Sequence, residues 1–350
     1  MNIIFDPSFN PRNKYISIIV EGLKKSGFNV KSFGDSIRSP RFFISASYVH
    51  LNWFEGIQGD KVYNIILLFL KQLFKLVILL IFNKKIIWTM HNKVSHDNKA
   101  SHYSRVLTWL LIKFSDKIVI HSHLSRNILV EKYNKPVNKI YYIPHPNYID
   151  VYKDFKKGTN VENREKLKIL FFGAVKQYKN IELIVKAAKE FEGSDIEFSI
   201  IGSPNSKTYA NSLKELVKHT KNINLSLSFI EDSKLVEEIG NHDIIVLPYS
   251  ISSSLNSGSV ILAFSLKKTV ICPNIGTVLD VKDHIKVFSY DYASEEEHFL
   301  NLKKQLKQVY NEWIKDKYIL DEYGYNAYRY ILENNDITNV ISKYHNLYKV

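Results

Sequence analysis

The sequence predicts an α/β protein made of two Rossmann-like domains that face a cleft. Twelve short apolar runs alternate with longer segments of helical period over residues 2–290 of the 350-residue chain. Continuous apolar runs are typical of buried parallel strands, and strands that alternate with helices indicate βαβ units. A charged, turn-rich stretch at 153–166 divides the runs into two series, which predicts two domains joined by a linker.

Each series supplies the strands of one sheet, and the chain ends in helices. From residue 294 onward, apolar residues recur at helical spacing, and we expect the last helix, about 335–350, to return to the first domain. The predicted domains are therefore 1–148 with this helix, and 165–334. The expected strands are 2–5, 29–33, 47–53, 84–90, 116–122 and 139–144 in the first domain, and 167–173, 196–202, 223–229, 243–249, 268–273 and 285–290 in the second.

The composition excludes several classes of protein. With 45% hydrophobic and 24% charged residues, the chain is that of a folded globular protein. A single cysteine, Cys272, rules out an internal disulfide scaffold. The first ten residues have no Lys or Arg before an apolar core, so we expect no cleaved signal peptide and a cytoplasmic location.

Positive charge is concentrated in the first domain. The formal net charge of the chain is +13, of which +12 falls in residues 1–150 and +1 in residues 151–350. A basic domain beside a neutral one indicates an anionic partner: nucleic acid, an anionic membrane surface or a phosphorylated substrate. Lysine used only for solubility is the alternative.

Residues 62–82 form an apolar segment long enough to cross a membrane. Lys71 and Lys75 lie one turn apart near its middle, and each costs roughly 2.5–3.5 kcal/mol on insertion scales, which disfavours a membrane span. Two interpretations remain. The segment is either a core helix of the first domain or a helix that lies in the membrane interface.

The segment 171–191, FFGAVKQYKNIELIVKAAKEF, combines a strand, a glycine and two lysines. The strand ends in Gly173, the loop carries Lys176 and Lys179, and an amphipathic helix begins near Asn180. A glycine at the carboxyl end of a strand lets the backbone approach a ligand, and two lysines there would neutralise a diphosphate. An ordinary solvated loop is the alternative.

A serine-rich loop follows a buried strand at 243–249, in the sequence DIIVLPYSISSSLNSGSVILAFSL. Its composition is typical of a flexible linker, but it lies at the carboxyl end of a strand and directly before a helix. There, Ser257, Gly258 and Ser259 would present backbone N–H groups and hydroxyls to an anion. Together with the lysine loop, it predicts a phosphate site.

These two segments resemble the C-terminal donor-binding domain of GT-B glycosyltransferases, in particular the large bacterial family that makes surface polysaccharides. The first domain adds NPRNKYISIIVEGLKKSGFNV, YVHLNWFE, IIWTMHNKVSHD and YYIPHPNY, which match patterns of that family in order. The resemblance covers most of the chain. It implies transfer of a hexosyl unit from a nucleotide-diphosphate sugar to an oligosaccharide acceptor that is lipid-linked.

The resemblance also implies roles for individual residues. His91, in TMHN, matches a histidine that reaches the reacting sugar from the acceptor domain, and acceptor contacts are expected at Asn52, Trp53 and His121. Lys176 and Lys179 take the places of the basic pair that binds the donor diphosphate, and Phe229 and Ile230 fall where main chain contacts the nucleotide base. The full set of expected donor-binding residues is Gly173, Lys176, Lys179, Gly202, Phe229, Ile230, Tyr249, Asn256, Ser257, Gly258 and Ser259.

One departure from the family bears on stereochemistry. Many retaining members carry two glutamates around the serine loop, where this chain has Ser254 and Leu262. Neither side chain can replace a carboxylate, so inversion is slightly favoured. Inversion needs a general base near the acceptor hydroxyl. The candidates are His91, His96 and Asp97, with a solvated loop as the alternative for the last two.

No metal and no cofactor are expected, since the sequence has neither HExxH nor an Asp-x-Asp pair and the lysines can neutralise the leaving group. Nucleic acid is not expected as a partner, because no known nucleic-acid-binding pattern occurs. We expect a protein attached peripherally to the inner face of the cell membrane. Two other functions stay open: a sugar-nucleotide epimerase of the same fold, and a non-catalytic, membrane-docked protein that binds nucleotide sugars.

Overall fold

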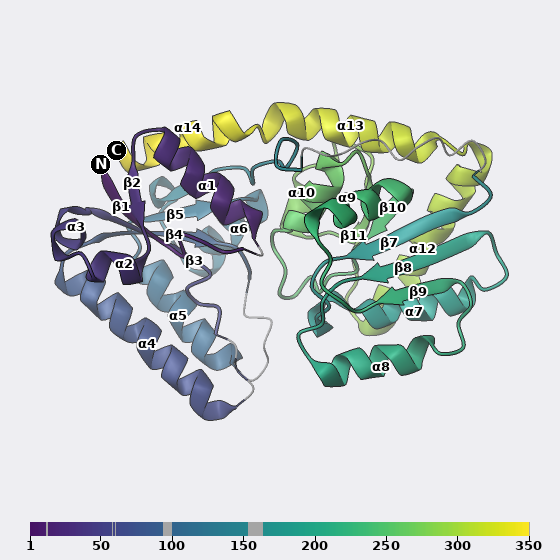
Figure 1. Cartoon of the computed structure of the whole chain (residues 1–350), viewed down its shortest axis with the longest axis horizontal. Coiled ribbons are helices and arrows are strands. Elements are labelled where there is room, and N and C mark those ends of the chain that lie inside the picture. Colours follow the sequence, from purple (N-terminus) through teal and green to yellow (C-terminus); the bar gives the residue numbers. More distant parts are fainter. Residues whose placement is uncertain (12, 58, 60, 94–99, 153–163, 350) are drawn as a thin grey trace. The chain divides into compact units, whose positions relative to one another are not determined.

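The computed structural model of the chain describes residues 1–349 except 12, 58, 60, 94–99 and 153–163 (Figure 1). The chain divides into two compact units. The first unit contains Met1–Pro146, Ser252–Asn256 and Asn335–Val350, and the second contains Asn147–Ile251 and Ser257–Asn334. Each unit has its own six-stranded parallel sheet.

The sheet of the first unit has the strand order β2-β1-β3-β4-β5-β6. The order reverses between β1 and β3, and the crevice outside the carboxyl ends at such a switch point is where open α/β sheets bind ligands. The strands are β1 (Asn2–Asp6), β2 (Asn29–Lys31), β3 (Tyr48–Asn52), β4 (Lys85–Met90), β5 (Lys117–Ile120) and β6 (Ile140–Tyr142).

Helices cover both faces of this sheet (Figure 1). On one face, α1 (Lys14–Lys25) packs beside the C-terminal helix α14 (Ile337–Lys349), and both contribute to one apolar cluster with Ile3 and Phe5. A second cluster lies under the helices of the other face. Those helices are α2 (Phe33–Ile37), α3 (Pro40–Ser45), α4 (Val62–Ile81), α5 (Ser101–Phe114) and α6 (His123–Asn127), which continues as a π-helical turn at Ile128–Lys132 and is followed by a 3₁₀ turn at Val137–Lys139.

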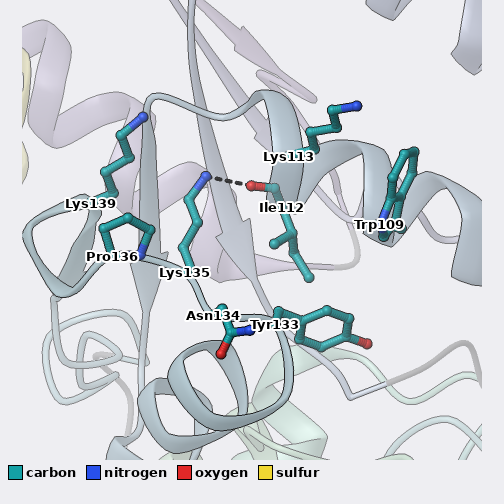
Figure 2. A pocket seen from close by; sticks show the side chains of 8 residues that line it. All are labelled: Trp109, Ile112, Lys113, Tyr133, Asn134, Lys135, Pro136 and Lys139. Carbon is teal, nitrogen blue, oxygen red and sulfur yellow. Dashed lines mark hydrogen bonds between the residues drawn. The ribbon is translucent and has the colours of Figure 1, made fainter.

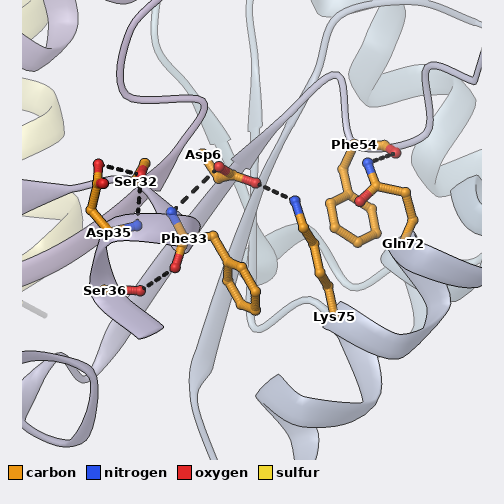
Figure 3. Close-up of polar contacts among 8 residues, drawn as sticks. All are labelled: Asp6, Ser32, Phe33, Asp35, Ser36, Phe54, Gln72 and Lys75. Carbon is orange, nitrogen blue, oxygen red and sulfur yellow. Dashed lines mark hydrogen bonds and ion pairs between the residues drawn. The ribbon is translucent and has the colours of Figure 1, made fainter. Parts of the chain in front are cut away.

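Helix α4 connects β3 to β4 and buries only one narrow side. Its buried residues are Ile65, Leu76 and Leu79, so the interpretation as a core helix holds for that side alone. Two polar residues of the helix, Gln72 and Lys75, also point into the unit (Figure 3). Lys75 Nζ forms an ion pair with Asp6 Oδ2 at 3.1 Å, and Gln72 Nε2 donates to the carbonyl oxygen of Phe54 at 3.1 Å.

The sheet of the second unit has the strand order β12-β11-β10-β7-β8-β9. This is the Rossmann order, with the switch point between β7 and β10. The carboxyl ends of β7 and β10 therefore open into the crevice where a nucleotide binds in such folds. The strands are β7 (Leu167–Phe172), β8 (Ile196–Ile201), β9 (Ile223–Ser226), β10 (Ile244–Val246), β11 (Val270–Pro273) and β12 (Phe288–Tyr290).

The helices of the second unit follow their strands as βαβ crossovers require. Helix α7, for example, buries Ile181, Ile184, Val185 and Ala188, which recur at helical spacing. The helices are α7 (Ile181–Glu190), α8 (Lys207–Val217), α9 (Asp232–Asn241), α10 (Gly258–Ser265), α11 (Gly276–Leu279), α12 (Glu295–Lys315) and α13 (Ile319–Asn334), with a 3₁₀ turn at Gln177–Lys179.

The predicted fold class is confirmed. Each of the expected apolar runs contains one strand, both sheets are parallel, and helices fill the chain after residue 294. The last helix, α14, packs in the first unit, where Tyr344 and Leu347 are buried.

Candidate functional site

Two loops of the second unit, one after β7 and one after β10, bring the expected donor-binding residues together. Gly173 ends β7 with a φ of +110°, a conformation that favours glycine. A Cβ on Gly173 would lie 3.3 Å from Lys179 Nζ and 3.8 Å from Ser259 Oγ. The lysine of the first loop and the serine of the second therefore lie beside the same bare stretch of backbone.

Gly202, at the end of β8, packs directly on Gly173. A Cβ on Gly202 would lie only 1.7 Å from the Gly173 carbonyl oxygen, so no other residue fits at this position without moving the loop. The Gly173 N–H donates to Ile201 O, and the Gly202 N–H donates to Ser226 O, each at 3.0 Å. These bonds hold the ends of β7, β8 and β9 together, which fixes the floor of the site.

Lys179 is a buried lysine, and the structure describes no carboxylate beside it. Its side chain is 6% exposed, and Nζ lies 5.4 Å from the centroid of the Phe171 ring and 5.3 Å from that of Tyr249. No carboxylate of the described residues forms an ion pair with it. Burial, and secondly the charge of Lys176, lowers the pKa of Lys179 to about 7. An anion in this place would restore the charge of the ammonium.

The N-terminus of α10 forms the other wall of this site. Ser257 caps the helix by accepting a hydrogen bond from the Val260 N–H at 3.2 Å. The backbone N–H of Ser257 donates to Thr277 Oγ1 at 3.0 Å, and its Oγ lies 3.3 Å from the Tyr249 hydroxyl. The N–H groups at a helix N-terminus carry partial positive charge, which adds to that of the lysines.

Two hydrogen bonds tie these loops to each other. Asn180 adopts a left-handed conformation with φ of 49°, and its Nδ2 donates to Pro248 O at 2.9 Å. The Ser250 N–H donates to Tyr178 O at 3.0 Å. The lysine loop and the serine loop therefore form one connected structure.

The remaining expected donor residues lie in two places. Phe229 and Ile230 follow β9 at the same carboxyl edge of the sheet, and Phe229 is 66% exposed. Asn256 lies in the segment Ser252–Asn256, which belongs to the first unit. Its Nδ2 lies 3.4 Å from the carbonyl oxygens of Met90 and His91, and Leu255 joins the apolar cluster of that unit.

In the first unit, the expected acceptor residues meet at the carboxyl edge of the sheet. His91 follows β4 and is 6% exposed, and its Nε2 lies 3.1 Å from Asn52 Oδ1 at the end of β3. Because an amide oxygen only accepts, Nε2 carries the proton and Nδ1 is left as an acceptor. The Trp53 ring stacks on His91 with centroids 3.8 Å apart, in a backbone conformation with φ of 47°.

A chain of hydrogen bonds extends from His121, which follows β5. His121 Nδ1 donates to Ile143 O at 2.7 Å, so its Nε2 accepts from the Tyr15 hydroxyl at 3.0 Å. Tyr15 in turn lies 2.8 Å from the Tyr344 hydroxyl of α14. The ring of His145 lies 5.7 Å from that of His121 and 5.1 Å from that of Tyr15.

These histidines are neutral at physiological pH. Burial is the main cause, and it lowers the pKa of His121 to about 4. Burial also lowers the pKa values of His145 and of His50, which lies in β3, to about 3, with a smaller contribution from the charge of His121. Burial, followed by the neighbouring histidines, holds the pKa of His91 well below its ordinary value. The cluster therefore offers hydrogen-bond donors and acceptors without a net charge, which suits sugar hydroxyls.

The two other candidate bases, His96 and Asp97, lie outside the described residues. A carboxyl group that the sequence did not single out is Glu55, which is buried and accepts from Trp88 Nε1 at 3.0 Å. Burial raises its pKa to about 7. Since Trp88 belongs to the apolar core, this pair is a packing feature of the unit.

Sequence reasoning missed four residues that build the two sites: Tyr15 and His145 in the first unit, and Asn180 and Thr277 in the second. Position in the chain is the signal that could have found Tyr15 and Thr277, because each follows the carboxyl end of a strand at the start of a helix. No group of three or more His, Cys, Asp or Glu side chains in the described part of the chain could hold a metal ion.

Comparison with known proteins assigns the chain to a family. The profile of the family described as "Glycosyl transferases group 1" matches residues 153–329. A GDP-mannose:glycolipid 4-beta-D-mannosyltransferase of Xanthomonas campestris pv. campestris is 24% identical over 190 residues, or 54% of this chain and 50% of that protein. The chain thus matches about half the length of its curated relatives.

Solved structures share the whole architecture. HepE of Anabaena in complex with UDP-glucose superposes with a TM-score of 0.72 at 12% identity, over 100% of both chains. Sucrose-phosphate synthase of Thermosynechococcus elongatus gives 0.70 at 12% identity, over 100% of this chain and 95% of the other. At such identities the likeness shows the fold alone. Because the family profile spans half of the chain, the protein belongs to the group 1 glycosyl transferases and is a glycosyltransferase of the GT-B fold.

Proposed function

We propose that this glycosyltransferase moves a hexosyl unit from a nucleotide-diphosphate sugar to a lipid-linked oligosaccharide, in the synthesis of a capsule, exopolysaccharide or O-antigen. The observation that carries the proposal is Lys179, which is buried beside Gly173 and the N-terminus of α10 and has no carboxylate partner among the described residues. Such a site stabilises a diphosphate both in the donor and in the leaving group. The Xanthomonas relative, named for GDP-mannose and a glycolipid, supports the acceptor class.

The donor site would act chiefly on the leaving group. As the acceptor oxygen bonds to the anomeric carbon, the bond from that carbon to the phosphate oxygen breaks and the nucleoside diphosphate departs with the electron pair. Lys176, Lys179 and the N–H groups at the start of α10 neutralise the charge that develops on it. Because these groups supply the positive charge, we expect transfer to continue without a divalent metal.

The first unit would bind the acceptor and receive its proton. His91 is neutral, stacked on Trp53 and hydrogen-bonded to Asn52, which suits the orientation of a sugar hydroxyl better than the storage of a proton. We therefore assign the general base to Asp97 or His96 and the orienting role to His91.

Inversion is the stereochemical outcome that we propose. The positions of the two glutamates of retaining relatives hold Ser254, which pairs with Asn92, and Leu262, which is buried in α10. The name of the Xanthomonas relative specifies a β linkage made from GDP-mannose, whose mannose is α-linked to phosphate. A transfer of that kind inverts the anomeric carbon.

Calorimetric titration of the full chain with GDP, UDP, GDP-mannose and UDP-glucose identifies the donor. The donor that binds is then incubated, in the presence of EDTA, with a polyprenyl-diphosphate oligosaccharide, and NMR of the extended glycolipid gives the configuration of the new linkage. The proposal expects release of the nucleoside diphosphate in step with glycolipid extension. Epimerisation of the donor without acceptor, or binding without turnover, would contradict it.

We also propose that the protein is cytoplasmic and attached to the inner face of the cell membrane, where a lipid-linked acceptor is found. The excess of positive charge in residues 1–150 supports this location, because the cytoplasmic leaflet carries anionic lipids.

A further inference from the structure

Helix α4 has an apolar outer side, unlike a helix on the surface of a water-soluble domain. Its polar residues Gln72 and Lys75 face the unit, where they bind Phe54 O and Asp6 (Figure 3). Its outer side is apolar, with Leu67 60% exposed and Phe74 66% exposed. The outer face of α4 consists of Val62, Tyr63, Ile66, Leu67, Leu70, Phe74, Val77, Leu80, Ile81 and Phe82.

Exposed apolar side chains extend along the whole length of α4, from Val62 to Ile81, which is unusual for a solvent-exposed surface. Contiguous exposed apolar patches on monomers rarely exceed a few hundred Å², and larger ones mark interaction sites. Of the most apolar 18-residue window of α4, only 17% is buried. Contact of these side chains with water costs roughly 25 cal/mol of free energy for each Å² of exposed apolar surface.

By length and composition α4 can also cross a membrane, but the sheet excludes that arrangement. The two strands that α4 connects, β3 and β4, pair with each other in parallel from Tyr48↔Lys85 to Asn52↔Thr89. A spanning α4 would carry this sheet and its covering helices into the hydrocarbon layer. A helix that lies in the plane of the interface, with its outer face among the lipids, keeps the sheet in water.

The charge around this face matches an anionic surface. Residues 61–82 and 101–114, which contain α4 and the adjacent helix α5, include no Asp or Glu. Lys61 and Lys71 of the α4 segment and Lys113 of α5 are exposed cations. Trp109 of α5 is 51% exposed, and indole rings prefer the level of lipid headgroups.

A basic pocket lies between the C-terminal end of α5 and the residues 133–139 that precede β6 (Figure 2). It has a volume of about 330 Å³, and its cations are Lys113, Lys135 and Lys139. Lys135 is buried, and Nζ donates to the carbonyl oxygens of Ser115, at 3.0 Å, and Ile112. An ammonium has three donors, so one N–H of Lys135 is left for a ligand.

Aromatic rings complete the pocket. Trp109 and Tyr133 line it, and Lys113 Nζ lies 5.0 Å from the centroid of the Trp109 ring. The carboxylate whose charge acts on Lys135 is that of Asp116, and this carboxylate already accepts a hydrogen bond from the Ile86 N–H. Positive charge next to exposed aromatic surface fits a phosphate that is attached to an acyl chain.

We propose that the first unit docks on an anionic bilayer through the outer face of α4, and that the pocket of Lys113, Lys135 and Lys139 binds the phosphate of a lipid headgroup. This deepens the membrane location that we propose above by naming the surface and the lipid chemistry. It does not depend on the donor site, which lies in the other unit.

Cosedimentation of the full chain with vesicles tests the proposal. Phosphatidylglycerol vesicles should carry the protein down at 0.05 M salt and release it as salt rises, whereas phosphatidylcholine vesicles should bind it weakly. The partition coefficient of the double variant Leu67→Asp/Phe74→Asp onto the phosphatidylglycerol vesicles should be at least tenfold lower than that of the unaltered chain. The variants Lys113→Gln and Lys139→Gln should each weaken binding to the anionic vesicles roughly fivefold.

Matched controls lie in the second unit. Leu300, which is 52% exposed on α12, provides Leu300→Asp as a control for the apolar variants. The exposed Lys214 and Lys218, on and next to α8, provide Lys214→Gln and Lys218→Gln for the basic ones. Both controls should sediment like the unaltered chain. Circular dichroism and tryptophan fluorescence, to which Trp53, Trp88 and Trp109 of the first unit contribute, verify that each variant is folded.

Three results would overturn the proposal. The first is vesicle binding that the variants of α4 leave unchanged, and the second is equal binding to neutral and anionic vesicles. The third is a dimer in light scattering that Leu67→Asp/Phe74→Asp breaks without any effect on sedimentation, since the face would then join two copies of the chain. If the unaltered chain binds anionic vesicles but transfers no sugar, that result contradicts only the proposed function.

Discussion

The imidazole of His91 lies flat against the indole of Trp53, with the ring planes 12° apart. Trp53 holds this position through a left-handed backbone conformation, and Asn52 fixes the other side of the imidazole by a hydrogen bond. A neutral histidine held so firmly can orient a hydroxyl group at low entropic cost.

His91→Ala should therefore lower kcat about 100-fold, within the range for loss of one positioned catalytic group, and leave the Kd of the nucleotide within twofold. Steady-state transfer assays and calorimetry measure the two quantities. His102→Ala, on the exposed side of α5, is the control and should behave like the unaltered enzyme. A loss of nucleotide affinity in His91→Ala would place His91 on the donor side and refute this role.

The affinity for the nucleotide sugar should depend on pH through Lys179. The pKa of the free ammonium is about 7, and a bound diphosphate raises it, so binding takes up a proton above pH 7. Affinity should be constant below about pH 6.5 and fall by up to tenfold per pH unit between pH 7 and 9. Calorimetry across this range measures it.

Lys179→Arg is the matched variant for that experiment, because arginine stays charged throughout the range. Its affinity should be independent of pH between 7 and 9. Lys179→Met should bind weakly at every pH. The same pH dependence in all three proteins would show that another group causes it.

Gly202→Ala should destabilise the second unit by about 3 kcal/mol, since the new methyl would occupy the position of the Gly173 carbonyl oxygen. The displaced loop should also weaken nucleotide binding. Gly34→Ala is the control: only Ser32 Oγ, at 3.9 Å, lies within 4 Å of its Cβ. Differential scanning calorimetry with and without nucleotide measures both effects, and equal transition temperatures for the two variants would contradict the packing argument.

The first unit should lose stability in mild acid. The pKa values of His50, His121 and His145 are lowered in the folded state to about 3 or 4, so the unfolded chain binds more protons below pH 6.5. The free energy of unfolding should be constant above about pH 7 and decrease as the pH falls from 6.5 towards 4. Denaturant titrations at pH 7.5 and 5.0 measure this decrease.

Tryptophan fluorescence makes that measurement specific to the first unit, because Trp53, Trp88 and Trp109 belong to it and Trp313 belongs to the second. The variant His50→Gln removes one of the titrating groups and should reduce the loss between the two pH values. An unfolding free energy that is equal at pH 7.5 and 5.0 would refute the account of a neutral histidine cluster.

Much of the candidate donor site could be predicted from the sequence, in the sense that the structure brings its expected residues together, because its parts are local. Gly173, Lys176 and Lys179 share one loop, and Ser257, Gly258 and Ser259 share another. Each loop follows a strand that the apolar runs identify, and the topology of parallel sheets brings adjacent carboxyl ends together. The specific roles of Phe229 and Ile230 stay predictions, because nothing in the geometry of the unit shows what they contact.

The first unit was harder to predict, because its cluster joins residues from distant parts of the chain. Tyr15 and Tyr344 are 329 positions apart, yet their hydroxyl groups share a hydrogen bond. Asn256 shows the same difficulty, because it directly precedes Ser257 in the serine loop while its Nδ2 lies 3.4 Å from the carbonyl oxygens of Met90 and His91 in the first unit. Its role toward the donor stays a prediction. Sequence position does not reveal on which unit a loop packs.

The excess charge of residues 1–150, the two series of strands and the apolar length of 62–82 follow from the sequence by itself, since composition and periodicity are local properties. Only the tertiary structure decided which side of α4 faces outward. Lys75 finds its partner in Asp6, 69 positions earlier, and this ion pair and the bond from Gln72 to Phe54 O lie on the side of the helix that also buries Ile65, Leu76 and Leu79. A hydrophobic pattern records which residues share a side of a helix, whereas the groups that the rest of the fold places against that side determine what it contacts.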